Sequence, residues 1–376
     1  MRLALLTAAW LLGGSAAAAD GRLSLSLSSD HHADAASLSQ LGGGDFGRAQ
    51  AATLAPRSGR NLAWIEDELR LGWHGPGGWQ WSALARQSGS LVISADALRL
   101  AARIARGEAL AGDEAWQVQA RLRAFSGAGL ALGRELHHQS AHGAWRLGWE
   151  LQGLALGRWR QRDVGGWVQG QAATQRYGFA LQSDETDNRL ELPFQSAAAR
   201  RGAGLLGAVS LHWRGQALQA GLALRDAGWL HWSRLPGQSM LLDTNTAGTD
   251  ADGFLLYRPL IQGQNHQATR SRWQVPRLTL QADAGLQGGA PREQRLGLRL
   301  DTLPGGPLLP ALTWQRPAQG GSGLGDLHWD AAWQLHQRRL TLGLKLERPW
   351  GGLSLRAGAD GRGHSREWAL AWQQAL

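Results

Sequence analysis

Two groups of histidines are the side chains of this sequence with the most evident capacity for chemistry. The first is Asp30-His31-His32-Ala33-Asp34, and the second is Glu135-Leu136-His137-His138 with the nearby His142. Imidazole and carboxylate groups that lie so close together are ligands for Zn²⁺ or Cu²⁺. Neither group contains a complete ligand set, and both fall at predicted strand ends or turns. The sequence therefore predicts no metal site and no cofactor.

A run of oxygen-bearing side chains extends from Asp243 to Gly253. Such oxygens bind Ca²⁺, but an EF-hand loop needs an oxygen ligand where Ala247 stands and a bidentate glutamate further on, and the run has neither. We interpret this run as part of a solvated loop over residues 236–265, on the extracellular side.

Motifs for nucleotide binding and acyl transfer give no support to an enzyme. Gly202-Ala-Gly204-Leu-Leu-Gly207 has the spacing of the dinucleotide fingerprint, but a strand with Val209 and Leu211 follows where a helix must begin. No G-x-S-x-G motif occurs. Because the chain has no cysteine, it has no thiol nucleophile, thiolate metal site or disulfide. We predict that the protein is not an enzyme.

The elements that must position these residues are strands. Residues 340–346 are typical, because leucine holds every even position while Thr341, Gly343 and Lys345 hold the odd ones. Alternation with a period of two predicts a strand that has one apolar and one polar face. The same alternation occurs in residues 116–124, 145–152, 295–301 and 329–336.

Turn signals separate these runs. They are Gly75-Pro76-Gly77-Gly78, Ser126-Gly127, Asp163-Val164-Gly165-Gly166, Pro304-Gly305-Gly306-Pro307, Pro349-Trp350-Gly351-Gly352 and Asp360-Gly361-Arg362-Gly363. Counting the runs between the breaks predicts about 14 to 18 strands of roughly ten residues each. Residues 95–112 fit less clearly, because they match both a period of two and a helical stripe through Leu98, Ala101 and Ala105. We favour a strand there.

The N-terminus has the pattern of a secretory signal peptide. Arg2 precedes an apolar stretch, Leu3–Leu12, and a run of small residues ends at Ala19. The stretch is shorter than the roughly 20 residues that a membrane-spanning helix needs. We expect residues 1–19 to be cleaved and residues 20–376 to form one domain. Residues 30–60 fit the strand pattern poorly, and a periplasmic arm, a lumen plug and an irregular first hairpin all stay open for them.

The charge balance is basic, at a formal +9. Nearly all of the excess is arginine, since Lys345 is the single lysine. In an exported protein this balance attracts anionic sugars, phosphates or lipopolysaccharide, and we expect no nucleic-acid partner.

Tryptophan decides between a soluble β-sandwich and a membrane barrel. The chain has 20 Trp but only 2 Tyr and 5 Phe, and Trp prefers the headgroup zone of a bilayer. We expect an interface girdle of Trp73, Trp81, Trp116, Trp145, Trp314, Trp329, Trp368 and Trp372. The sequence thus favours an all-β, transmembrane, antiparallel up-and-down barrel.

The C-terminus adds a resemblance. Trp368, Leu370, Trp372 and the final Leu376 share one parity, which resembles the closing strand of Gram-negative outer-membrane β-barrel proteins, although here the last residue is Leu and Gln374 interrupts the apolar set. No specific family is identified. The resemblance implies an outer-membrane location, contact with membrane lipid and lipopolysaccharide, and recognition of the last strand by the barrel assembly machinery.

Parity then predicts the inward face of the barrel. The basic candidates for the lumen are Arg70, Arg121, Arg123, Arg146, Arg299, Lys345 and Arg356, and the acidic candidates are Glu68, Glu150 and Asp301. An open lumen with this lining favours anions, whereas arginines paired with carboxylates fill a closed one. We predict a pore for small anionic or polar solutes. The alternatives are a structural or secretion-associated barrel that binds an exported polysaccharide or pilus apparatus, and an outer-membrane enzyme acting on lipid.

Overall fold

A computed structural model describes residues 21–41, 48–192, 201–249, 252, 255–257, 259–285, 294–303, 308–316 and 326–376. The predicted signal peptide, the turn predicted at Pro304-Pro307 and part of the Asp243-Gly253 run lie outside these residues.

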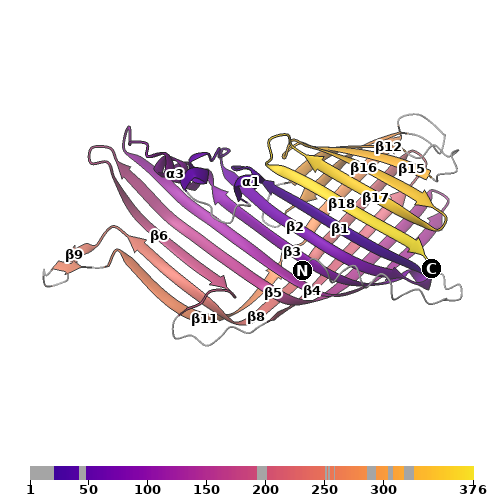
Figure 1. Ribbon diagram of the computed structural model, residues 1–376, viewed down its shortest axis with the longest axis horizontal. Helices are drawn as coiled ribbons and strands as arrows, with labels where there is room; N and C mark the ends of the chain where they lie inside the picture. The colour runs from indigo at the N-terminus through magenta and orange to yellow at the C-terminus, as the bar shows by residue number, and fades with distance from the viewer. Residues whose placement is uncertain are drawn as a thin grey trace.

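Most of the described chain forms one antiparallel sheet that closes on itself (Figure 1). Its strands are β1 (Arg22–Ala33), β2 (Arg60–His74), β3 (Trp79–Ser94), β4 (Glu114–Ser140), β5 (Gly143–Gln171), β6 (Arg176–Asp187), β7 (Gly202–Arg214), β8 (Leu218–Asp243), β11 (Ile261–Gln274), β12 (Arg277–Gly285), β13 (Arg295–Thr302), β14 (Leu308–Arg316), β15 (Asp326–Gln334), β16 (Arg339–Arg348), β17 (Gly351–Ala359) and β18 (Ser365–Ala375). The short strands β9 (Ala247–Thr249) and β10 (Leu255–Tyr257) pair only with each other.

The barrel has 14 strand positions. The strands β6 and β7 share one position between β5 and β8. The strand β6 pairs with residues 160–171 of β5 and 237–243 of β8, whereas β7 pairs with residues 144–156 of β5 and 219–231 of β8. In the same way β11 and β12 run end to end along β8. Pairing of β1 with β18, for example Leu25 opposite Trp372, completes the circle. The closed all-β barrel predicted from alternation is confirmed, at the lower end of the predicted strand number.

The barrel wall is tall on one side and short on the other. The strands β4, β5 and β8 have 27, 29 and 26 residues, whereas β13 to β17 have 8 to 10. Figure 1 shows β6, β8 and β11 extending beyond the level at which β16, β17 and β18 end. Two predicted turns are wrong for this reason: Ser126-Gly127 is a register shift within β4, and Asp163-Gly166 lies within β5.

The loop predicted over residues 236–265 is also shorter than expected. The strand β8 continues to Asp243 and β11 begins at Ile261. The prediction missed these strand ends because Gly237, Gln238 and residues 262–265 are polar or small, so they show no alternation. A strand that rises beyond the apolar zone needs no apolar face.

Residues 95–112 contain a helix, so the strand favoured there is wrong. The helix α3 (Ala95–Arg106) begins where the Ser94 hydroxyl accepts a hydrogen bond from the Ala97 N–H at 3.2 Å. It ends at Gly107, whose φ of 70° suits glycine. Its inner face, with Leu98 and Ala102, packs on Ala35, Ala36 and Leu54. The periodicity of these residues is compatible with a strand and with a helix, and packing against the β1–β2 connection stabilises the helix.

Residues 30–60 combine the end of β1 with two short helices, α1 (Leu38–Leu41) and α2 (Arg48–Ala52). A 3₁₀ turn, η2 (Pro76–Gly78), joins β2 and β3 at the predicted turn. The small helices lie together with α3 near one end of the strands (Figure 1). No helix among the described residues is long and apolar enough to cross a membrane.

The outer face of the barrel is rich in exposed apolar side chains. Five of the tryptophans predicted for the girdle are exposed: Trp73, Trp81, Trp145, Trp329 and Trp368. Trp314 and Trp372 are half-buried. Trp116 is an exception, because Leu100 and Leu110 from the β3–β4 connection and Val168 cover it and leave it 7% exposed. A sequence pattern does not reveal that a loop folds back over that part of the wall.

Candidate functional site in the lumen

A layer of ion pairs crosses the lumen at mid-height. Arg277, the first residue of β12, pairs with Glu66 of β2, and its Nε lies 3.6 Å from Asp226 of β8. Asp226 also accepts two hydrogen bonds from Arg86 of β3, at 2.5 and 3.0 Å. Because β2 and β12 are six positions apart in a circle of 14, these contacts join nearly opposite walls.

The layer continues along the tall wall through hydrogen bonds. Arg86 donates to Gln152 Oε1 at 3.2 Å, and Gln152 donates to Glu150 at 2.7 Å. Glu150 is paired with Arg70, which also donates to Glu68 at 3.1 Å. Buried guanidinium groups are retained at low cost only where carboxylates neutralise them, and here Asp226 is shared by Arg86 and Arg277. The layer therefore connects the five strands β2, β3, β5, β8 and β12.

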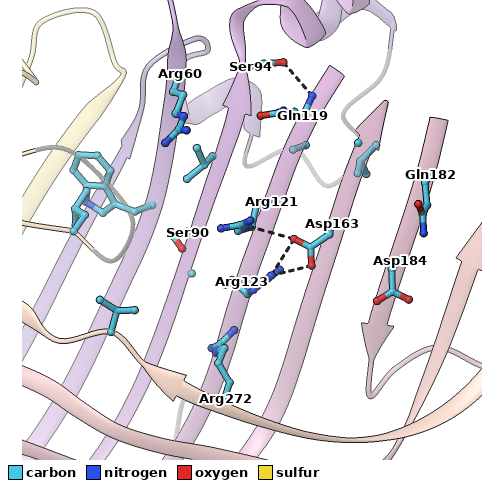
Figure 2. A pocket seen from close by; sticks show the side chains of 18 of the residues that line it. Arg60, Ser90, Ser94, Gln119, Arg121, Arg123, Asp163, Gln182, Asp184 and Arg272 are labelled. Carbon is cyan, nitrogen blue, oxygen red and sulfur yellow. Dashed lines mark hydrogen bonds and ion pairs between the residues drawn. The ribbon is translucent and has the colours of Figure 1, made fainter. Parts of the chain in front are cut away.

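A chamber of about 940 Å³ lies on one side of this layer. It faces the end of the barrel where β2 begins at Arg60 and β3 ends at Ser94, which we call the loop side. Its charged lining consists of five arginines and two aspartates: Arg60, Arg121, Arg123, Arg272, Arg277, Asp163 and Asp184. Figure 2 shows Arg121, Arg123 and Asp163 joined on one wall, with Arg272 below them. Arg123 donates to both oxygens of Asp163, at 2.9 and 2.8 Å, and Arg121 lies 3.4 Å from it. Positive charge is in excess in this chamber.

Arg272 is the most unusual cation of the chamber. Its guanidinium lies 4.8 Å from the centre of the Trp159 ring, and its Nη2 donates a long, 3.4 Å hydrogen bond to Gln274. Its Nε and Nη1 are buried without a hydrogen-bond partner, and among the described residues no carboxylate pairs with it. Guanidinium N–H groups without a partner are potential donors to an anion.

Apolar side chains also face inward, beneath Arg272. Buried residues of β3, β4, β5, β7 and β8 form one cluster: Leu84, Phe125, Ala131, Leu154, Leu156, Trp159, Leu206, Leu230, Trp232 and Leu235. Phe125 belongs to this cluster and also lines the chamber. The inward face of the tall wall is thus part core and part binding surface, whereas we had expected a uniformly polar lining.

A second cavity of about 400 Å³ lies on the other side of the ion-pair layer. Glu66, Glu68, Arg70, Arg86 and Glu150 line it. Arg277 lines both cavities, so it stands at the boundary between them. Carboxylates balance the arginines here, in contrast to the loop-side chamber.

The remaining residues predicted for the lumen lie in local pairs. Arg299 donates to Asp301 at 2.6 Å and Arg356 to Asp330 at 2.8 Å, on the short wall. Lys345 pairs with Glu347, and Arg146 lies 3.1 Å from Glu135. These pairs join residues of one strand, of adjacent strands or, for Arg356 and Asp330, of the two strands on either side of β16, and they do not cross the lumen.

The sequence did not predict the residues that form the ion pairs across the lumen. Arg86, Asp226 and Arg277 lie 140 and 51 residues apart and outside the clear alternating runs. Asp226 occupies a bulge with a φ of 65°, and Arg277 follows Pro276. Arg339, which is fully buried between Asp30 at 2.6 Å and Glu367 at 2.8 Å, was missed too. The one signal available was Asp226, because acidic residues are uncommon inside strands.

A serine and a histidine are paired on the outer wall. His231 Nδ1 lies 2.7 Å from Ser271 Oγ, and both residues are exposed. They are opposite each other on β8 and β11, two residues from the exposed Trp229 and Trp273. The intervening Leu230 and Trp232 are fully buried on the inward side, so the pair faces away from the lumen.

No protein-family model and no curated protein matches this chain. Several solved outer-membrane barrels are similar in structure. A deltaS2S3 mutant of the TodX monoaromatic hydrocarbon channel is 10% identical over 96% of this chain and 91% of that one, with a TM-score of 0.38. The outer-membrane protease OmpT of Escherichia coli is 7% identical over 95% and 96%, with a TM-score of 0.24. The siderophore receptor PirA of Pseudomonas aeruginosa is 7% identical over 96% and 81%, with a TM-score of 0.22.

Proposed function

We propose that this chain is an outer-membrane barrel that conducts small anionic solutes through a gated lumen. The observation that carries the proposal is the loop-side chamber, in which five arginines face two aspartates. Arg60 and Arg272 have no carboxylate partner among the described residues. Rings of cationic side chains in a confined lumen favour anions over cations.

The ion-pair layer supplies the gate in this proposal. An anion in the chamber competes with Glu66 and Asp226 for Arg277, which both cavities share. An anion that pairs with Arg277 adds a negative charge to the lumen and releases a carboxylate, which must then be hydrated or held by another arginine, as Arg86 holds Asp226. The apolar outer face, with its exposed tryptophans, would then lie against lipid as an interface girdle.

The test is the conductance of the refolded chain in a planar bilayer, with the reversal potential recorded across a salt gradient. We expect anion selectivity in the wild type. The double variant Arg60→Gln/Arg272→Gln should shift the reversal potential toward that of cations. Arg176→Gln is the matched control, because Arg176 is exposed at a strand end outside the chamber, and it should leave the potential unchanged. Cation selectivity in the wild type would refute the proposal.

A second candidate function is hydrolysis of a lipid ester at the outer wall, which the His231–Ser271 pair favours. The contact is short enough for His231 to take the proton of the hydroxyl, and acyl transfer needs this pair. No carboxylate pairs with His231 among the described residues, so an orienting group is not in place. The test is release of fatty acid from phospholipid vesicles by the wild type and by Ser271→Ala, with Ser233→Ala as the control. Equal release would exclude Ser271 as the nucleophile.

A further inference from the structure

Three side chains that are far apart in the sequence meet at the loop-side end of the barrel. His32 ends β1, Asp34 follows it, and His336 lies in the turn between β15 and β16. One ligand atom from each lies within 4.8 Å of the others. His32 Nε2 is 2.9 Å from Asp34 Oδ1, and His336 Nε2 is 3.3 Å from the same oxygen. The sequence predicts no metal here because the third ligand is some three hundred residues away.

We propose that His32, Asp34 and His336 bind a first-row divalent ion of the Zn²⁺ type. Two imidazoles and one carboxylate are a ligand set for such ions, and they leave further positions for water. Ligand atoms at about 2.0–2.1 Å from a tetrahedral zinc lie about 3.3 Å from one another, and the two distances to Asp34 Oδ1 are near that separation. The ion would join the start of the β1–β2 connection to the turn between β15 and β16.

The hydrogen bonds around His336 are in conflict without an ion. Its Nε2 faces the Arg57 Nη1 donor at 3.3 Å and also the Asp34 carboxylate at 3.3 Å. A protonated Nε2 cannot accept from Arg57, and an unprotonated one cannot donate to Asp34. A cation between the Nε2 lone pair and Asp34 Oδ1 resolves the conflict. Asp34 Oδ1 has too many donors in its present state, since His32, His336 and Arg57 all approach it.

The second independent observation is the ring of His32. The residue is 1% exposed, its Nδ1 has no hydrogen-bond partner, and its ring stacks on Trp64 with centroids 4.4 Å apart. Its Nε2, at 2.9 Å from Asp34 Oδ1, is the ring nitrogen turned toward the proposed site, and the stacking on Trp64 holds the ring in that orientation.

Arg57 holds the place of the ion. Its Nη1 lies 2.8 Å from Asp34 Oδ1 and 3.2 Å from the His336 carbonyl oxygen. Its side chain is 39% exposed, so it can leave toward solvent while His32 and Asp34 stay buried. Metal and guanidinium compete for one carboxylate oxygen, and removal of the guanidinium should therefore strengthen metal binding.

The experiment is a Zn²⁺ titration by calorimetry on the full refolded chain, without a polyhistidine tag and after treatment with a chelator. We expect one Zn²⁺ per chain, binding at least about tenfold weaker in His336→Ala and tighter in Arg57→Gln. His138→Ala is the matched control, because His138 is exposed in the other histidine group, and its affinity should equal that of the wild type. Absence of stoichiometric binding in both the wild type and Arg57→Gln overturns the proposal, as does wild-type affinity in His336→Ala.

A spectroscopic measurement keeps the proposal testable where His336→Ala does not fold. Cu²⁺ added to the wild-type chain should give a paramagnetic resonance spectrum with coupling to two imidazole nitrogens. Coupling that survives in His138→Ala supports the assignment to His32 and His336. A spectrum with one nitrogen or none contradicts it.

Discussion

Arg277 of β12 forms an ion pair with Glu66 of β2 across the lumen. The first residue of one strand thereby contacts a residue in the middle of another that is almost opposite in the barrel. Since both cavities of the lumen are lined by Arg277, this contact lies at their boundary.

Replacement of Arg277 should open the lumen. In Arg277→Ala the bridge to Glu66 is lost and the two cavities join, so single-channel conductance should rise several-fold over the wild type. Arg299→Ala provides the control, because Arg299 pairs with its near neighbour Asp301 and does not cross the lumen. If both variants conduct alike, the layer is not the constriction.

A second prediction concerns Arg272, a cation of the chamber that has no carboxylate partner among the described residues. Trp159→Leu removes the ring beneath the Arg272 guanidinium while keeping an apolar side chain. A desolvated cation–π contact contributes about 2 kcal/mol or more, so Arg272 should become mobile and anion selectivity should fall, while the smaller side chain in the buried cluster lowers the stability of the barrel. Reversal potentials and a heat-modifiability assay on the same preparation separate the two effects. Unchanged selectivity would mean that Arg272 does not need the ring.

The inward apolar cluster should behave as a core. Leu230 is fully buried in it, so Leu230→Ala should lower the free energy of unfolding by about 2–5 kcal/mol. Urea unfolding of the barrel in lipid vesicles measures this. Ile104→Ala is the comparison, since Ile104 is 52% exposed on α3, and a loss comparable to that of Leu230→Ala would contradict a core role for the cluster.

The cap of α3 gives a smaller and local prediction. Ser94→Ala removes the acceptor for the Ala97 N–H and the Ser94 contacts with Gln117 and Gln119 of β4, which should cost about 1 kcal/mol. Hydrogen exchange should report faster opening of α3 while the amides of β5 stay protected. Uniform loss of protection in the whole barrel would instead show that α3 and the barrel unfold together.

The sequence predicts the barrel well because alternation is a local property of each strand. The leucines of residues 340–346 specify the two faces of β16 without reference to any other part of the chain. Turns inside tall strands, such as Asp163-Gly166, were misread because strand length depends on the neighbours that the strand pairs with. Period alone did not separate strand from helix at residues 95–112, where packing decides.

The site was less predictable than the fold. Parity selected inward residues, among them Arg123, but it does not say which of them meet across the lumen. Asp34 and His336 illustrate the limit, because their contact depends on the order and stagger of strands around the circle. Those quantities follow from the closed sheet as a whole and from no single segment.

The pairing of β1 with β18 has a consequence for how the molecule is made. The seam joins strands from the two ends of the described chain, as Leu25 opposite Trp372 shows. Contacts between such distant residues carry the largest loop-closure entropy and form late in folding. Until β18 arrives, a nascent molecule presents two unsatisfied strand edges, and it would be vulnerable to aggregation and proteolysis throughout that interval.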